Sequence, residues 1–300
     1  MATKIKTDVY QMVTDKFIEA LEGGTIPWHK PWCGVNGGAF NRISKKPYSL
    51  LNQLMLGVPG EYATYKQWES LGGKVKKGEK SKFIVFWKML QVPTDDDEAV
   101  LNENGDNVNF KFIPVLRHFR VFHISQVEGV DPLPDEELEE LKKTATERDV
   151  TADAIINSYT THSGVKLKEI KSNRAFYRPA TDEIVVPLRE QYEVMEEFYS
   201  TTFHEMTHST GAESRLNRKE ISGSTSFGDT GYSKEELVAE IGAAMLCVKA
   251  GLDLEKSFDN STAYVQNWLQ ALKNDKKLVV SAAGRAEKAV RYILREEASV

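Results

Sequence analysis

The stretch FYSTTFHEMTHSTG, residues 198–211, carries two histidines four positions apart, with a glutamate directly after the first. Its apolar residues recur at three- and four-residue spacing and no proline interrupts them, which predicts a helix ending near Gly211. On a helix His204 and His208 share a face, so both imidazoles can bind one metal ion. Glu205 then lies beside the open position of that ion, where it can act as the general base of metal-assisted hydrolysis.

A metal ion of this kind needs a third protein ligand, and residues 232–246 downstream offer candidates. Ser233 and Glu236 have the spacing of a helix-capping box, while Glu240 lies among Val, Ala, Ile and Gly, where an unpaired carboxylate is costly to bury. The segment resembles the second helix of glutamate-type zincins, in which an acidic residue four positions after the ligand Glu bonds a ligand His. That resemblance makes Glu236 the ligand and Glu240 its support. The reverse stays open, because capping gives Glu236 another role. Asp229 is a third candidate that a turn would also explain.

The composition is that of a globular protein. The 300 residues are 41% hydrophobic and 28% charged, and the length suggests about two domains. Cys33 and Cys247 form no CxxC pair, so the sequence predicts neither a disulfide scaffold nor a cysteine zinc site, and it fits a reducing compartment. No apolar run of about 18 residues predicts a membrane span.

Basic residues concentrate in the first part of the chain. Residues 1–90 contain 14 Lys+Arg and 7 Asp+Glu, whereas the other 210 residues contain 25 and 37, and four of the five tryptophans fall in the basic part. Phosphates attract Lys and Arg, and unpaired bases stack on flat rings, so this composition suits single-stranded nucleic acid. The alternative is that the rings form a core and the lysines a solvated rim.

The pattern before residue 128 predicts an α+β unit with a small antiparallel sheet. Apolar spacing predicts a helix over residues 4–22 that Gly23 ends, and strands are expected over 82–88, 110–113 and 117–123. The turn-rich basic segment at 72–81 reads as a hairpin tip.

Several motifs in this part resemble the N-terminal domain of ArdC-type antirestriction proteins, a domain shared with TraC-type primases of plasmids. An HExxH domain follows it in the ArdC family, so the resemblance covers essentially the whole chain. The motifs are Pro27-Trp28 to Trp32, Asn41 to Tyr48, Asn52, Tyr65 to Trp68, the GGxVxKGE run at 72–79 and Val121 to Gln126.

The resemblance implies that the N-terminal domain binds single-stranded DNA and that the protein protects incoming plasmid DNA from host restriction. It also implies a C-terminal zincin domain similar to Spartan-type proteases, which act on DNA-bound proteins, in a plasmid-borne bacterial protein of the cytoplasm. The expected organisation is a DNA-binding domain over residues 1–127, an acidic linker over 128–148 and a zincin-like domain over 149–300. In zincins the edge of a strand just before the HExxH helix can hold an extended peptide, and residues 183–187 predict that strand.

Two functions follow from these expectations. In the first, His204, His208 and one of the two glutamates hold a divalent ion, with zinc expected and manganese an alternative. Glu205 activates water, and the substrate is a DNA-bound protein or a restriction-enzyme subunit. In the second, the protein is a DNA-binding shield whose metal site is structural or very selective. No membrane partner is expected. The candidate DNA contacts are the aromatic and basic residues Trp28, Lys30, Trp32, Arg42, Lys45, Lys46, Tyr48, Lys74, Lys76 and Lys77.

Overall fold

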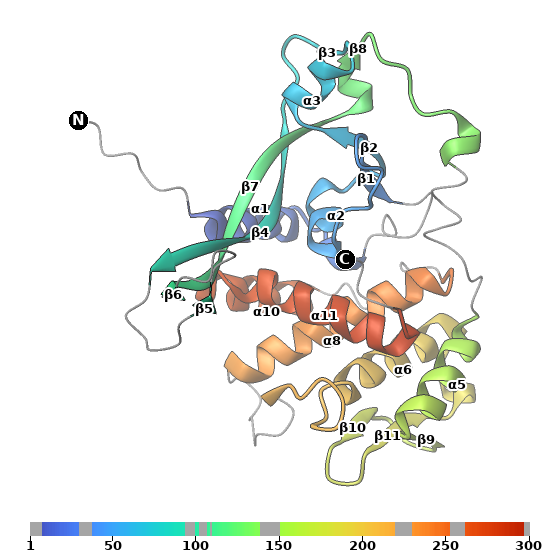
Figure 1. Cartoon of the computed structure of the whole chain (residues 1–300). Helices are drawn as coiled ribbons and strands as arrows, with labels where there is room; N and C mark the ends of the chain where they lie inside the picture. The colour runs from blue at the N-terminus through green and yellow to red at the C-terminus, as the bar shows by residue number, and fades with distance from the viewer. Residues whose placement is uncertain are drawn as a thin grey trace.

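The computed structural model describes residues 8–29, 38–93, 100–101, 107–108, 110–138, 151–219, 230–252 and 262–296. Mixed helices and sheets form two parts, with the N-terminal sheet at one end of the molecule and a helical part with a small sheet at the other (Figure 1). Lys30, Trp32, Cys33 and Asp229 lie outside the described residues. No helix among the described residues is long and apolar enough to cross a membrane.

The N-terminal part combines short helices with a four-stranded sheet. Asp8 caps α1 (Val9–Glu22) by accepting a hydrogen bond from the amide of Gln11. The sheet has the order β1-β2-β7-β4, formed by β1 (Ala39–Asn41), β2 (Gly60–Ala63), β7 (Phe110–His123) and β4 (Lys82–Pro93). Its pairs are antiparallel as predicted, except that β1 runs parallel to β2. The remaining elements are η1 (Pro27–His29), α2 (Leu50–Leu56), α3 (Tyr65–Ser70), β5 (Val100–Leu101), β6 (Asn107–Val108) and η4 (Ile124–Gln126).

Two local predictions in this part were wrong. The segment expected as a hairpin tip contributes β3 (Lys74–Val75), which pairs instead with β8 (Val127–Glu128), after β7. The two strands expected at 110–113 and 117–123 form the single strand β7, in which Pro114 pairs with Met89 of β4. β2 pairs only with the far end of β7, so the missing N–H of this proline interrupts no described ladder on the other side.

The C-terminal part places helices against a three-stranded sheet of order β10-β11-β9. The strands are β9 (Lys166–Ile170), β10 (Phe176–Arg178) and β11 (Glu183–Pro187), and the helical elements are α5 (Ala152–Ser163), η5 (Arg189–Gln191), α6 (Met195–Ser209), α8 (Thr230–Lys249), α10 (Thr262–Asn274) and α11 (Leu278–Leu294). β11 is the central strand, so the expectation that its edge holds a peptide was wrong: β9 and β10 already pair with both of its edges. Among the described residues, the outer edge of β10, which is antiparallel to β11, pairs with no other strand.

One hydrophobic core joins the two parts of the chain. Residues of α1, η1 and α2 pack with residues of α8, α10 and α11 (Figure 1). Trp28 is central to it: its ring stacks on Phe17 with centroids 6.3 Å apart and meets Trp268 edge-on at 5.7 Å. The acidic segment after residue 127 also packs on the N-terminal part, since the amide of buried Leu133 donates to Glu61 Oε1 at 2.8 Å. The domain limits at 127 and 149 stay a prediction, and this packing shows that the two parts are not independent bodies.

Candidate metal centre

Helix α6 carries the HExxH pattern and fixes the spacing of its side chains. The helix is uninterrupted from Met195 to Ser209, and the hydroxyls of Thr202 and Thr207 donate to carbonyls one turn back, which satisfies them inside the core. His204 and His208 therefore share one face, with their Nε2 atoms 3.0 Å apart. Glu205 is 8% exposed and lies in the same turn.

Helix α8 brings a carboxylate to these imidazoles. A Cβ at Gly242 would lie 2.6 Å from Cγ2 of Thr207, so the absence of a side chain lets the two helices approach closely at this point. Six residues earlier in α8, Glu236 places its carboxylate 3.5 Å from Nε2 of His204 and 3.4 Å from Nε2 of His208. Among the described residues, these three form the group of donors able to hold a metal ion, with all ligand atoms within 4.8 Å of one another.

The donor separations fit a tetrahedral divalent cation. Metal–ligand bonds of about 2.1 Å at tetrahedral angles place neighbouring donors about 3.4 Å apart. The two Nε2 atoms lie 3.0 Å apart, Glu236 Oε1 lies 3.4 Å from Nε2 of His208, and Glu236 Oε2 lies 3.5 Å from Nε2 of His204, so each contact is close to that spacing. Two imidazole nitrogens and one carboxylate oxygen are also the donor set of catalytic sites that keep a fourth position open.

A further glutamate lies beside the other nitrogen of each imidazole, Glu240 for His204 and Glu235 for His208. Nδ1 of His204 lies 3.7 Å from Glu240 Oε1, and Nδ1 of His208 lies 3.3 Å from Glu235 Oε1. Such carboxylate contacts fix the ring orientation and tautomer of a ligand histidine and raise its basicity. Glu240 also lies 3.6 Å from Nε2 of buried His29 in η1, so the N-terminal part reaches the surroundings of the site.

Arg218 holds Glu235 in place. Its guanidinium donates to both carboxylate oxygens of Glu235, to the hydroxyl of Thr210 and to the carbonyl of Thr207, and the arginine and glutamate side chains are each 6% exposed. A buried carboxylate needs such a partner because its desolvation costs several kcal/mol. Sequence reasoning missed this pair: Glu235 adjoins Glu236 and could have been weighed, but no pattern identifies Arg218.

The carboxylates set the charge of the imidazoles. Burial alone would disfavour the charged form of His208, yet hydrogen bonds to Glu235 and Glu236 outweigh it and raise its pKa to about 10. The pKa of His204 is also raised: burial opposes the shift, and the bond to Glu236 and the charge of Glu240 outweigh it. Burial likewise opposes ionisation of Glu236, but the two imidazoles keep its pKa well below the ordinary range.

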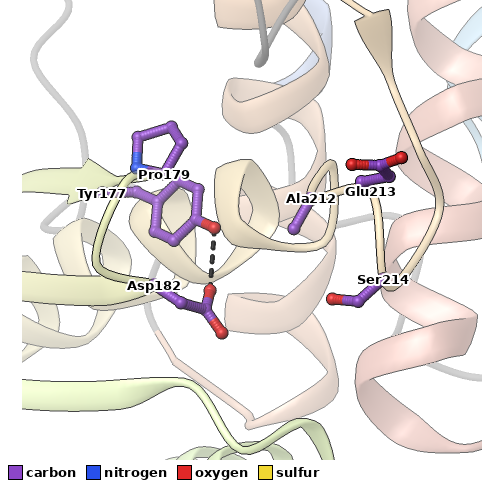
Figure 2. Close-up of a pocket in the computed structure, with 6 residues that line it drawn as sticks. All are labelled: Tyr177, Pro179, Asp182, Ala212, Glu213 and Ser214. Carbon is purple, nitrogen blue, oxygen red and sulfur yellow. Dashed lines mark hydrogen bonds between the residues drawn. The ribbon is translucent and has the colours of Figure 1, made fainter.

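A braced turn and an open pocket follow α6. The pocket has a volume of about 500 Å³. Figure 2 shows Tyr177 of β10 and Pro179 and Asp182 of the β10–β11 turn facing the segment after α6, which contributes Ala212, Glu213 and Ser214. The Tyr177 hydroxyl donates to Asp182 at 2.8 Å, and Arg215 donates to both oxygens of Asp182 and to the Ser209 carbonyl. This network ties the end of the HExxH helix to the small sheet.

Two family models match the chain. One, described as a zincin-like metallopeptidase, covers residues 152–285, and the other, the N-terminal domain of anti-restriction factor ArdC, covers residues 7–122. Among solved structures, metal-free antirestriction ArdC from the R388 plasmid is 34% identical, with 96% of this chain and 97% of that chain covered and a TM-score of 0.70. The chain belongs to the ArdC family of antirestriction proteins.

Other relatives extend the ArdC comparison. The Mn(II)-bound structure of R388 ArdC is 32% identical, with 96% of this chain and 98% of that chain covered and a TM-score of 0.69. The uncharacterized protein y4eC of Sinorhizobium fredii (strain NBRC 101917 / NGR234) is 32% identical, covering 94% of this chain and 90% of y4eC. A DNA primase TraC of Escherichia coli is 35% identical over 98% of this chain, but the chain spans only 28% of that primase.

The structure separates the candidate ligands of this ArdC-type chain. It brings Glu236 to both imidazoles and puts Glu240 behind His204. The capping-box prediction for Ser233 and Glu236 was wrong, because α8 begins at Thr230 and Ser233 lies within the helix. Glu236 therefore has no capping role that would compete with metal binding.

The candidate DNA contacts differ in their exposure and in their partners. Trp28 is 2% exposed with its ring packed in the shared core, so it offers no face to a base, and the interpretation of this ring as a core residue is the right one. Arg42 pairs with buried Glu61, Lys45 pairs with Glu137, and Tyr48 is half-buried. Lys46, Lys74, Lys76 and Lys77 are exposed, and Lys76 donates to the Ser125 carbonyl at 2.8 Å.

Proposed function

We propose that this ArdC-type protein is a metal-dependent peptidase that single-stranded DNA brings to its protein substrate, and that it protects entering plasmid DNA from restriction. The observation that supports the peptidase is the combination of a three-donor site with Glu205 in the same helical turn as His204. A purely structural metal site would not need a carboxylate at that position.

The residues have distinct roles in this proposal. His204, His208 and Glu236 hold a divalent cation, which when bound polarises a peptide carbonyl and acidifies water. Glu205 takes a proton from the attacking water and delivers it to the leaving amine. Glu240 and Glu235 orient the two imidazoles, and Arg218 orients Glu235. Zinc is the expected ion because the donor set is two imidazole nitrogens and one carboxylate, and the Mn(II)-bound R388 relative makes manganese the alternative.

The proposed substrates are proteins on or near DNA, including subunits of restriction enzymes. The free edge of β10 offers backbone groups to an extended segment, and α6 contacts both β10 and β11. A peptide added to this edge would extend the sheet against which α6 packs.

The test compares Glu205→Gln with the wild-type protein. The variant keeps the size of the side chain and all three ligands, so it should bind metal normally and lose cleavage of a DNA-bound protein by about 100-fold or more. Metal content and cleavage are measured on the same preparations, and plasmid transfer is scored into restricting and non-restricting recipients. Retained protection by Glu205→Gln would contradict the peptidase and support a DNA-binding shield with a structural metal site.

A further inference from the structure

The two longest strands of the protein form a basic ribbon. β4 and β7 pair antiparallel from Lys82↔Val121 to Pro93↔Phe110, and Figure 1 shows this ribbon extending beyond the rest of the N-terminal sheet. Neither strand contains an Asp or Glu, and together they contain five basic residues: Lys82, Lys88, Lys111, Arg117 and Arg120. A positively charged surface without acidic residues attracts polyanions.

The pairing register assigns the side chains of the ribbon to two faces. Val85 and Leu116 are buried in the shared core on one face. On the other face, which we call the outer face, Ile84 is still covered, but beyond it the side chains emerge: Phe86 is half-buried, and Lys88 and Arg117 are exposed. Phe119, directly opposite Ile84, is 51% exposed.

Aromatic rings on the outer face are arranged as a stack. Phe86 and Phe119 lie on neighbouring strands with ring centroids 4.7 Å apart and planes only 5° from parallel. Arg117 is directly opposite Phe86, and Lys88 is the next residue of β4 on the same face. The face therefore presents flat rings beside two exposed cationic side chains.

We propose that the outer face of the ribbon, centred on Phe86, Arg117 and Phe119, is the surface on which single-stranded DNA stacks its bases. Flat rings beside cations match the two components of a single strand, since bases stack on the rings and phosphates pair with the cations. A duplex keeps its bases stacked on each other and offers only the phosphates. The inference rests on the proposed DNA binding and moves the contact away from Trp28 to residues that the sequence did not single out.

The test measures binding of a fluorescein-labelled oligothymidine to the full chain by anisotropy. Phe119→Ala should weaken binding by about 5- to 150-fold, the range for loss of one base–aromatic stack. Phe119→Trp keeps an aromatic ring and should bind as the wild type does. Arg117→Gln should weaken binding and lower the slope of log affinity against log salt by about one. Phe112→Ala is the matched control, because Phe112 lies on the same strand, is 58% exposed and belongs to the opposite face. It should bind as the wild type does.

The outcomes separate this inference from the proposed function. Wild-type binding together with equal binding by Phe119→Ala and Phe112→Ala would overturn the assignment to this face and leave DNA binding itself intact. No binding by the wild type would overturn both. A folded Phe119→Ala variant, shown by an unchanged unfolding temperature, that binds duplex as tightly as the wild type and the single strand weakly would support stacking as the cause.

Discussion

The metal centre and the outer face of the β4–β7 ribbon differ in the burial and pairing of their charged side chains. At the metal centre the charged groups are largely buried and each is held by another, as Arg218 holds Glu235 and Glu235 holds His208. On the ribbon the cations Lys88 and Arg117 are exposed and no acid occurs in either strand. The two sites differ because their proposed functions differ. A catalytic centre needs side chains that are held in place before the substrate binds, whereas flexible single-stranded DNA needs a surface whose side chains can adapt.

The largest expected effect tests whether three donors make the metal centre. Glu236→Ala removes a ligand, so metal affinity should fall by far more than the roughly 10- to 100-fold that loss of an outer partner causes. Glu240→Gln removes such a partner and should stay within that range. Titration of zinc and manganese into both variants measures the difference, and equal losses would show that Glu240 also binds the ion.

The next prediction tests whether a buried ion pair at the metal centre contributes more to stability than an exposed ion pair does. Arg218→Met leaves the carboxylate of Glu235 buried without its arginine, which should lower the free energy of unfolding by about 3–5 kcal/mol. Arg178→Met breaks an ion pair with Glu183 in which the arginine is 49% exposed, and should cost less than about 1 kcal/mol. Denaturant unfolding of both variants is the measurement. If both variants lost a similarly small free energy of unfolding, burial would not distinguish the two ion pairs.

A third effect tests the close approach of α6 and α8. Gly242→Ala puts a Cβ against the Thr207 side chain and should destabilise the fold by about 1–3 kcal/mol and loosen metal binding. Gly284→Ala in α11 meets nothing within 4 Å and should stabilise the protein by up to about 1 kcal/mol, because alanine favours helix. Thermal unfolding distinguishes the two, and an unchanged metal affinity in Gly242→Ala would show that helix spacing does not set the site.

The smallest effect concerns Asp182, whose side chain is 40% exposed and pairs with Arg215 after the HExxH helix. The hydrogen bond from Arg215 keeps the pKa of Asp182 below its ordinary range. The stability this gives is therefore fully present above the unfolded-state pKa and is lost as the pH falls through the folded-state pKa. Asp182→Asn should destabilise the protein by less than about 1 kcal/mol at neutral pH, with the difference shrinking in acid. Asn suits the left-handed backbone at φ 49°, so the substitution removes the charge and one acceptor of Arg215 without straining the backbone. A difference independent of pH would assign the effect to packing.

Local periodicity explains which parts of the sites could be predicted. His204, Glu205 and His208 follow from the spacing of one helix, and the strands 82–88 and 183–187 follow from short apolar runs. From the residues alone the choice between Glu236 and Glu240 stays open, because it depends on where α8 crosses α6 near Gly242; the resemblance to glutamate-type zincins was the signal that favoured Glu236. Trp28 was placed among the DNA candidates because it lies in a basic segment rich in aromatic residues. Its burial depends on Trp268, which comes 240 positions later in the sequence, so no local pattern predicts it.

The packing of α1, η1 and α2 against α8, α10 and α11 has a consequence for how this unit is inherited. If the chain were divided at residues 139–148, each half would expose to water core rings that the other half now covers, including Phe17, Trp28 and Trp268. A gene fusion that retains only one half should therefore give an insoluble product. The two halves of the chain would then be inherited together as one unit. The long TraC primase of Escherichia coli matches nearly the whole of this chain rather than one half of it, as such a unit would.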